Sequence, residues 1–434
     1  MHKQIYDFFD ANKLFYSSQY GFRRSHSTEY AAFELVDKIL HDLDNGQIPI
    51  SVFLDLSKAF DTLNHSILIT KLKYYGFQNN AIKLMDSYLS NRYQYVELNG
   101  VLSSHLLITT GVPQGSILGP LLFIIYMNDI ANASSLFYPI LYADDTTLSA
   151  TLKTFNLNNN AIASNINVEL DKISLWLKVN KLSLNTEKTK AMLFHMPQKT
   201  VNYPDIYINQ VKIEFVKQFN FLGIILDDSM KLKSHMNHTV TKISKVVGII
   251  NKLKNFLPLG ALLNIYNALI VPHLNYGVLL LRKHCDKLFL LQKKAIRAVS
   301  CAKYNAHTDG LFISLHVLKV HDICALHALK FCFKLENGLL PDFFHQPGIF
   351  IKNRFYHNYD SRRNNDYVIP LVKHEFAKSG MRYIIPHYFN QLDICYKEKI
   401  YTHSINGLKF YFKNTQISKY SRICNIPSCY ICQN

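Results

Sequence analysis

Apolar strand patterns with aspartate at their ends are the feature that most constrains this fold. Apolar and other residues alternate from Ile50 to Leu56, and this period of two predicts a β-strand with Asp55 near its end. Tyr138 to Ala150 is predicted to form two short strands, and the polar turn between them contains Asp144 and Asp145. We therefore expect a sheet that presents three carboxylates at the ends of its strands.

Helical patterns surround these strands, and the mixture predicts an α+β fold in which helices cover one face of the sheet. The helices are expected at residues 1–45 outside the polar stretch 17–27, at 64–89 with a break at Gly76, after the glycine-rich loop 111–119, and at 161–179. A hairpin that turns at Asn99-Gly100 is expected at 93–107, a loop at 156–160, and further strands at 191–194 and 219–226.

The charge pattern changes at residue 229. Residues 229–300 carry 12 Lys and Arg but a single acid, Asp286. Apolar residues recur there at spacings of three and four, which predicts an amphipathic helix: Met236, Val240, Ile243, Val247 and Ile250. Lys242, Lys245 and Lys252 fall together on the other side of this helix. A charged helix face is usually just solvated. Because acidic residues are almost absent here, this face could equally bind phosphates, and both interpretations stay open.

The overall charge favours a nucleic-acid partner. The chain has 48 Lys and Arg against 31 Asp and Glu, which gives a net charge of +17. Polyanions are the usual partners of an excess of this size, and nucleic acid is the commonest of them. A basic protein without such a partner is the alternative.

Cysteine usage and apolar patterning favour a soluble intracellular protein of the nucleus or cytoplasm, with no membrane partner. The 8 Cys residues are scattered and none precedes Cys285, which argues against a secreted disulfide framework. Cys424, Cys429 and Cys432 resemble half a zinc site without a fourth ligand, so free thiols are favoured. No signal peptide is recognised, and the longest apolar run, at 117–127, is shorter than the ~20 residues that span a bilayer.

The three aspartates predict a metal site. Neighbouring carboxylates repel one another and raise a pKa unless a cation neutralises them. Hard oxygen ligands of this kind suit Mg²⁺ or Mn²⁺. Two such ions about 3.5–4 Å apart can activate an attacking hydroxyl and stabilise a leaving pyrophosphate. An Asp-Asp pair in an ordinary solvated turn is the alternative.

Three segments, in the same order and with similar gaps, resemble the palm motifs of reverse transcriptases: 53–61 (FLDLSKAFD), 111–116 (GVPQGS) and 142–145 (YADD). Other segments resemble the non-LTR (LINE-type) retrotransposon class, nearest to its jockey and CR1 groups: 19–23 (QYGFR) with Ser27-Thr28, 184–189 (LNTEKT), 221–223 (FLG), and Tyr266 with 275–277 (NYG). The resemblance covers nearly all 434 residues.

This resemblance implies a right-hand polymerase fold and an RNA-directed DNA polymerase. Residues 1–228 would form partial fingers and a palm built on an antiparallel sheet, and residues 229–300 a helical, basic thumb. Residues 301–434 would be mostly helical, although we expect the chain to become irregular after Pro341. The implied partners are an RNA template, a DNA primer and deoxynucleoside triphosphates (dNTPs).

The resemblance also assigns roles to single residues. Asp55, Asp144 and Asp145 would bind two Mg²⁺ ions, with Mn²⁺ as the alternative. Lys188 would protonate or neutralise the leaving pyrophosphate, and Lys190 competes with it for this role. The thumb lysines 242, 245 and 252 would follow the phosphate backbone.

The remaining assignments concern the dNTP and the template: Arg23, Lys58, Ala59, Phe60, Gln114 and Gly115. Arg23 would reach the triphosphate, because a guanidinium fork suits phosphate, and Arg24 is the alternative at this place. The backbone at Lys58 and Ala59 would meet the triphosphate, and Phe60 would exclude a 2′-hydroxyl unless it is plain core. Gln114 and Gly115 would pack against the nucleotide and template, although Gln114 also suits a simple turn.

Parts of the family pattern are not found. Full elements begin with an apurinic-type endonuclease, and their fingers extend further before Gln19, so we expect an N-terminally truncated, decayed copy. The family usually has a Trp soon after the Tyr-Gly pair of the thumb, whereas this chain has VLLL at 278–281. A catalytically dead nucleic-acid-binding relic and a group II intron-type maturase are the alternatives, although a maturase needs a strongly basic region where 301–434 is mixed. An RNA-templated RNA polymerase is disfavoured, because Phe60 stands where it needs a small or polar residue.

Overall fold

The computed structural model describes residues 1–152, 160–196, 202–355 and 364–420. It divides the chain into two compact units, 1–31 with 45–219 and 32–44 with 220–434. The sequence predicts domain boundaries after residues 228 and 300. These boundaries separate the fingers and palm from the thumb, and the thumb from the C-terminal region, and they stay a prediction. Most of the predicted loop 156–160 and all three cysteines of the half zinc site lie outside the described residues.

A five-stranded sheet is the framework of the first unit, in the order β11-β8-β1-β7-β6. Its strands are β1 (Ile48–Leu54), β6 (Tyr138–Tyr142), β7 (Asp145–Leu152), β8 (Lys190–Leu193) and β11 (Glu214–Phe215). Antiparallel pairing joins β1 to β7 and β8, and β7 to β6, whereas β11 runs parallel to β8. The predicted α+β class is confirmed, but the sheet is mixed and not purely antiparallel. The reason is that the chain turns through the hairpin of β9 (Tyr207–Ile208) and β10 (Val211–Lys212) before β11.

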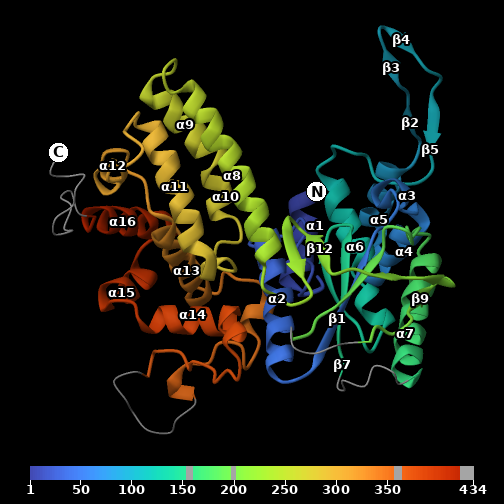
Figure 1. The fold of residues 1–434 in the computed structure, drawn as a ribbon. Helices are drawn as coiled ribbons and strands as arrows, with labels where there is room; N and C mark the ends of the chain where they lie inside the picture. The colour runs from blue at the N-terminus through green and yellow to red at the C-terminus, as the bar shows by residue number, and fades with distance from the viewer. Residues whose placement is uncertain (153–159, 197–201, 356–363, 421–434) are drawn as a thin grey trace. The chain divides into compact units, whose positions relative to one another are not determined.

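The core of this unit lies between the sheet and its helices (Figure 1). The helices are α1 (His2–Ala11), α3 (Ala59–Thr62), α4 (His65–Tyr74), α5 (Asn79–Leu89), α6 (Leu118–Met127) and α7 (Asn160–Val179). Every residue of β1 is buried. Ile50 and Val52 belong to the core, and on the opposite face the ring of Phe53 stacks on Phe219 at 3.8 Å between centroids. Both faces of the central strand are therefore covered, by the core with its helices on one face and by the ring of Phe219 on the other.

A narrow hairpin leaves the body of the first unit between α5 and the glycine-rich loop (Figure 1). Its strands are β2 (Arg92–Gln94), β3 (Glu97–Leu98), β4 (Val101–Leu102) and β5 (Leu106–Ile108). The predicted turn is confirmed, because Asn99 and Gly100 have φ angles of 50° and 80°. Two successive positive φ angles are the requirement of the tight turn that Asn-Gly favours.

Helices make up most of the second unit. They are α2 (Thr28–Asp44, from residue 32 on), α8 (Lys233–Leu253), α9 (Leu259–Leu269), α10 (Val271–Asn275), α11 (Cys285–Val299), α12 (Asp309–Ser314), α13 (Val320–Glu336), α14 (Met381–Asn390), α15 (Ile394–Thr402) and α16 (Ile405–Ser418). The hairpin of β12 (Gln218–Phe221) and β13 (Ile224–Asp227) precedes α8 in the chain. The described residues between Pro341 and Gly380 are irregular apart from short 3-10 turns. The expectation of an irregular chain is wrong beyond them, because α14, α15 and α16 follow and bury apolar side chains against α13.

Two buried acids hold α2 in the second unit. Asp37 accepts a hydrogen bond of 2.6 Å from Nε of Arg382, and Asp44 accepts hydrogen bonds from the backbone N–H groups of Lys373 and His374. The sequence pattern shows α2 as a helix but not these partners more than 300 residues away. Among the described residues, no helix combines the length and apolar character needed to cross a bilayer.

Candidate active site

The pairing of β1 with β7 brings the predicted acids together. The last pair of the ladder is Leu54 with Thr146, so Asp55 and Asp145 follow directly at the same end of the two strands. Asp145 also pairs with Tyr142 across the β6–β7 hairpin, and Asp144 lies in the turn between these two strands. Two sequence segments about 90 residues apart thus place three carboxylates at one edge of the sheet.

The charges of these acids act on one another. Burial raises the pKa of Asp145 above its ordinary value, and the negative charges of Asp144 and Asp55 raise it further. Within the part of the chain that the structure describes, no ion pair neutralises these carboxylates, and no group of three His, Cys, Asp or Glu side chains is tight enough to hold one ion. Uncompensated like charges with hard oxygen atoms fit a divalent cation, which would relieve the repulsion.

The segment before β8 fixes the backbone of Asp55. The N–H of Asn185 donates to the carbonyl of Asp55 at 2.8 Å, and the N–H of Asp55 donates to the hydroxyl of Thr189 at 3.4 Å. Thr189 is fully buried. The resemblance assigned a role only to Lys188 in this segment, whereas the structure adds Asn185 and Thr189 as residues that position the metal ligand.

The same segment separates the two competing lysines. Lys190 forms an ion pair of 2.8 Å with Glu214 and donates to the carbonyl of Glu187. The side chain of Lys188 is exposed, and within the described residues it forms no ion pair. Because Lys190 is already bound to a carboxylate, Lys188 is the lysine of this segment that is free to meet a phosphate.

The predicted finger motif packs directly on the acidic turn. The N–H of Tyr20 donates to the carbonyl of Leu141 at 2.7 Å, and the fully buried Gln19 accepts hydrogen bonds from the N–H groups of Gly21 and Ala143. A Cβ atom at Gly21 would lie 2.3 Å from the nitrogen of Ala143. Only glycine fits here, so Gln19 and Gly21 position the residue next to Asp144. Apart from the motif itself, nothing in the sequence indicated that Gln19 and Gly21 contact the backbone of Ala143.

Arg23 lies two residues beyond this contact. Its Nη1 donates to the carbonyl of Tyr16 at 3.0 Å, its guanidinium lies over the ring of Phe15, and its buried Nε has no partner in the described residues. Arg24 is exposed and pairs with Asp7 at 2.9 Å. The two arginines therefore differ: Arg24 forms an exposed ion pair, and Arg23 has a buried Nε without a partner among the described residues.

The residues after β1 form a compact corner. Lys58 has a left-handed φ of 48° and precedes α3, whose first residue, Ala59, is buried. The ring of Phe60 stacks on Phe123 at 4.2 Å between centroids and meets Phe22 edge-on at 6.3 Å. Phe60 is partly buried, so part of its ring packs against the core and part of the side chain is exposed.

The glycine-rich loop docks on this corner. The N–H of Val112 donates to the carbonyl of Phe60 at 3.0 Å, and Nε2 of Gln114 donates to Oδ1 of Asp61 at 2.6 Å. Gly111 has a φ of +84°, and a Cβ atom on it would lie 2.7 Å from the backbone of Asp61. Gly115 also has a positive φ, of 78°. The structure thus brings Phe60 and the Gln114 loop together at one corner.

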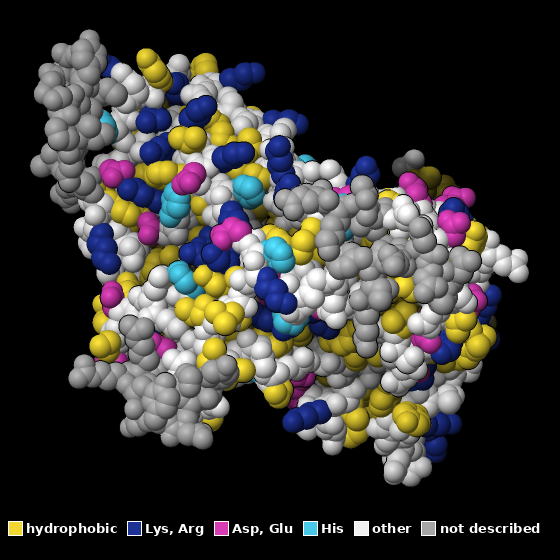
Figure 2. Space-filling model, turned by 60° about the horizontal axis from the view of Figure 1, so that its bottom comes forward, with side chains coloured by type: hydrophobic (Ala, Val, Ile, Leu, Met, Phe, Trp, Pro, Cys, Tyr) yellow, Lys and Arg dark blue, Asp and Glu magenta, His cyan; other side chains and the backbone are white. Residues whose placement is uncertain are grey.

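The predicted basic face lies in the second unit. Met236, Ile243, Val247 and Ile250 are buried and Val240 is half-buried, which confirms the amphipathic helix α8. Lys242, Lys245 and Lys252 are exposed, and none of them forms an ion pair with a described residue. Figure 2 shows that Lys and Arg side chains are numerous over the visible surface and Asp and Glu side chains are fewer.

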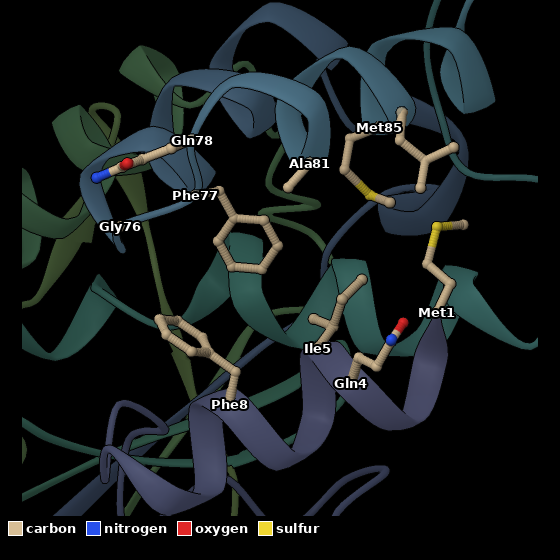
Figure 3. Close-up of a pocket in the computed structure, with 10 residues that line it drawn as sticks. Met1, Gln4, Ile5, Phe8, Gly76, Phe77, Gln78, Ala81 and Met85 are labelled. Carbon is tan, nitrogen blue, oxygen red and sulfur yellow. The ribbon is translucent and has the colours of Figure 1, made fainter.

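A separate hollow of about 340 Å³ opens between α1 and the turn before α5 (Figure 3). Phe8 and Phe77 meet edge-on at its side, with 5.6 Å between their ring centroids. Its lining has no charged side chain and contains none of the predicted site residues. The hollow therefore lacks the charged side chains that would hold a phosphate or a metal ion.

Comparison with known proteins gives a consistent result. The family described as "Reverse transcriptase (RNA-dependent DNA polymerase)" matches residues 1–226. The RNA-directed DNA polymerase from mobile element jockey of Drosophila melanogaster is 28% identical over 342 residues, which cover 75% of this chain and 36% of that protein. The probable RNA-directed DNA polymerase from transposon X-element of the same species is 25% identical over 351 residues, which cover 77% and 37%. The chain spans little more than a third of these relatives.

Among solved structures, apo telomerase from Candida tropicalis matches with a TM-score of 0.40 and 12% sequence identity, over 79% of this chain and 58% of that one. A likeness this weak carries no argument about the fold. The two transposon relatives do confirm the predicted resemblance to non-LTR retrotransposon enzymes.

Proposed function

Because the chain belongs to the reverse transcriptase (RNA-dependent DNA polymerase) family, we propose that it copies an RNA template into DNA, extending the 3′-hydroxyl of a primer with dNTPs. The observation that carries this proposal is the β1–β7 pairing, which places Asp55 beside the Asp144–Asp145 turn. The relatives come from mobile elements, which supports a role in the copying of a retrotransposon.

In the proposed reaction, Asp55, Asp144 and Asp145 hold two Mg²⁺ ions, for which Mn²⁺ can substitute. When bound, these ions activate the primer hydroxyl and stabilise the leaving pyrophosphate. The mutual repulsion that raises the pKa of Asp145 supports this assignment. Asn185 and Thr189 hold the Asp55 backbone in place, and Gln19 and Gly21 hold the turn that carries Asp144.

Lys188 is proposed to neutralise the leaving pyrophosphate or to donate a proton to it. An ammonium group at this place favours the charge that develops as the phosphoanhydride bond breaks. The ion pair of Lys190 with Glu214 supports the choice between the two lysines. Arg23 is proposed to reach the triphosphate with the part of its side chain that is still exposed.

The sugar and base of the incoming nucleotide are proposed to meet the corner formed by α3 and the glycine-rich loop. The backbone at Lys58 and Ala59 faces the triphosphate, and Gln114 and Gly115 pack against the nucleotide and template. Phe60 excludes a 2′-hydroxyl, because a hydroxyl against its ring would lose its hydration without gaining a partner. The remaining exposure of Phe60 supports this role.

The right-hand division into regions belongs to the same proposal. Residues 1–228 would be partial fingers and palm, and residues 229–300 a thumb that follows the template–primer duplex through Lys242, Lys245 and Lys252. Residues 301–434 would support the thumb. The exposed, unpaired lysines of α8 support the thumb assignment.

A primer-extension assay tests the proposed function. The substrate is an RNA template annealed to a DNA primer, with dNTPs and Mg²⁺, and the same primer on a DNA template is the comparison. DNA synthesis on the RNA template supports the proposal. Binding of the template–primer without any extension would instead identify a nucleic-acid-binding relic. Extension restricted to the RNA of a self-splicing intron would identify the maturase alternative.

A further inference from the structure

A hollow of about 280 Å³ in the second unit combines an apolar floor with a cationic rim. The floor is made by Leu279, Leu280 and Ile384, all of them buried. The rim comes from two 3-10 helices, η2 (Arg282–His284) and η5 (Glu375–Ser379), and from one face of α14. Ligand pockets usually measure about 300–1,000 Å³, so this η2–η5 hollow suits one small group and not a duplex.

The rim of the η2–η5 hollow carries three cations and one acid, Glu375. Nζ of Lys283 donates to the carbonyl of Glu375 at 2.7 Å, and Nζ of Lys378 forms an ion pair with its carboxylate at 2.6 Å. The side chain of Arg282 is exposed and forms no hydrogen bond or ion pair with a described residue. Burial lowers the pKa of Lys283, Glu375 raises it, and the charge of Lys378 lowers it again. An anion in the hollow would therefore relieve a repulsion that one acid does not balance.

Helix α14 adds two aromatic rings to the same hollow. Tyr383 and His387 are four residues apart and so share one face of the helix, and their rings stack with 5.7 Å between centroids. Burial lowers the pKa of His387, and the positive charge of Arg282 lowers it further, so the imidazole is neutral at pH 7. The hollow thus offers a neutral aromatic surface close to a guanidinium group without a partner among the described residues.

Aromatic rings beside cations are typical of sites for single-stranded nucleic acid, where bases stack on the rings and the cations contact phosphates. A free phosphate would engage the cations but leave the rings and the apolar floor uncovered. A duplex keeps its bases stacked on one another, so they do not enter a hollow of this size. The observations therefore favour an unpaired nucleotide over both.

We propose that the η2–η5 hollow binds one unpaired nucleotide of a nucleic-acid strand, with its phosphate on Arg282 and its base against Tyr383 and His387. The guanidinium suits this place because its fork can donate two parallel N–H groups to one phosphate. The inference rests on the proposed function only in taking a nucleic-acid strand as the partner, and the binding test below involves no catalysis.

Fluorescence anisotropy with a labelled single-stranded RNA of about 12 nucleotides, without dNTPs or Mg²⁺, tests this. Arg282→Gln removes the unpaired cation. Its matched control is Lys409→Gln, which makes the same change in net charge at an exposed lysine of α16 outside the hollow. Tyr383→Ala removes one ring, and Tyr383→Phe is its control because it keeps the ring. The same strand as DNA, and the RNA annealed to its complement, are measured in parallel.

Arg282→Gln should weaken binding of the single strand and lower the slope of log K against log salt by about 0.7. Tyr383→Ala should weaken it by roughly 5- to 150-fold, which is the usual effect of losing one stacked base. Both controls should keep the parental affinity, and Tyr383→Ala should bind the duplex as the parent does. A loss on RNA, on DNA or on both supports the proposal and identifies the strand that occupies the hollow.

Parental affinity for the single strand in both Arg282→Gln and Tyr383→Ala overturns the proposal, as does a parent that binds no single strand. An equal loss in Lys409→Gln would mean an effect of overall charge, and a loss confined to Arg282→Gln would mean a phosphate contact without a bound base; both overturn it as well. Primer extension separates this result from the proposed function. A parent that extends primers while the variants bind normally contradicts the hollow alone, and a parent that binds through the hollow without extending contradicts catalysis alone.

Discussion

A Cβ atom on Gly21 would lie 2.3 Å from the backbone nitrogen of Ala143, the residue that precedes Asp144. The contact joins a loop near the start of the chain to the turn that carries the proposed metal ligands, and Gln19 reinforces it with hydrogen bonds to both sides. The geometry of the acids therefore depends on Gly21, which is not itself one of the predicted metal ligands.

Gly21→Ala should displace the acidic turn and lower kcat for primer extension by roughly 10- to 100-fold, because a shift of about 1 Å at a reacting centre costs that much. Template–primer affinity should change little. Gly310→Ala is the matched control: nothing lies within 4 Å of the added Cβ atom, and alanine is a better helix former than glycine in its helix, α12. Equal kcat values for the two variants would remove Gly21 from the site.

Phe60→Val should admit ribonucleotides. Losing the ring removes a desolvation penalty on the 2′-hydroxyl of about 1–3 kcal/mol, which corresponds to roughly 5- to 150-fold in discrimination. The measurement is the ratio of kcat/KM for deoxynucleotide over ribonucleotide in parent and variant. An unchanged ratio together with a lower Tm would mean that the stacking on Phe123 is the whole role of Phe60.

Replacing Lys242, Lys245 and Lys252 together by Gln should flatten the salt dependence of template–primer binding. For every phosphate that the variant no longer neutralises, the slope of log K against log salt should fall by about 0.7–0.9. Lys73, Lys83 and Lys178 are exposed lysines on helices of the first unit, and their replacement by Gln makes the same change in net charge. If both triple variants shift the slope equally, the effect is one of overall charge and not of this face.

The carboxylate of Glu169 should contribute to stability in a pH-dependent way. Its ion pair with Lys172 and its hydrogen bonds from Ser134 and Ser135 lower its pKa from 4.5 to about 2. A lowered pKa means that the contribution is complete above about pH 5 and is lost as the pH falls toward 2. Glu169→Gln should therefore cost about 1–3 kcal/mol in unfolding free energy at pH 7, and the difference should shrink in acid. A pH-independent difference from denaturant unfolding would contradict this.

The sequence predicted those parts of the fold whose signals are local. The alternation before Asp55 and the Asn99-Gly100 pair are confirmed as strand and turn, because side-chain period and positive φ are properties of a few neighbouring residues. The parallel strand β11 and the attachment of α2 through Asp37 to Arg382 were not predicted, since both depend on partners distant in the chain.

The same distinction holds at the candidate site. Motif resemblance named Asp55, Asp144, Phe60 and Gln114, and the structure brings Phe60 and the Gln114 loop together at one corner. The resemblance gave no role to Thr189, which contributes a single hydrogen bond to the backbone of Asp55. Such positioning contacts have no pattern of their own in one sequence. The metal, substrate and thumb roles stay predictions until they are measured.

The central claim is that the strand-end acids catalyse DNA synthesis on RNA, and primer extension by Asp145→Asn tests it most directly. Asparagine keeps the shape of the side chain but removes the charge. The parent should extend a DNA primer on an RNA template with Mg²⁺, and the variant should lose at least about 100-fold in rate while binding the template–primer with unchanged affinity. A variant that extends the primer at the parental rate would contradict the account.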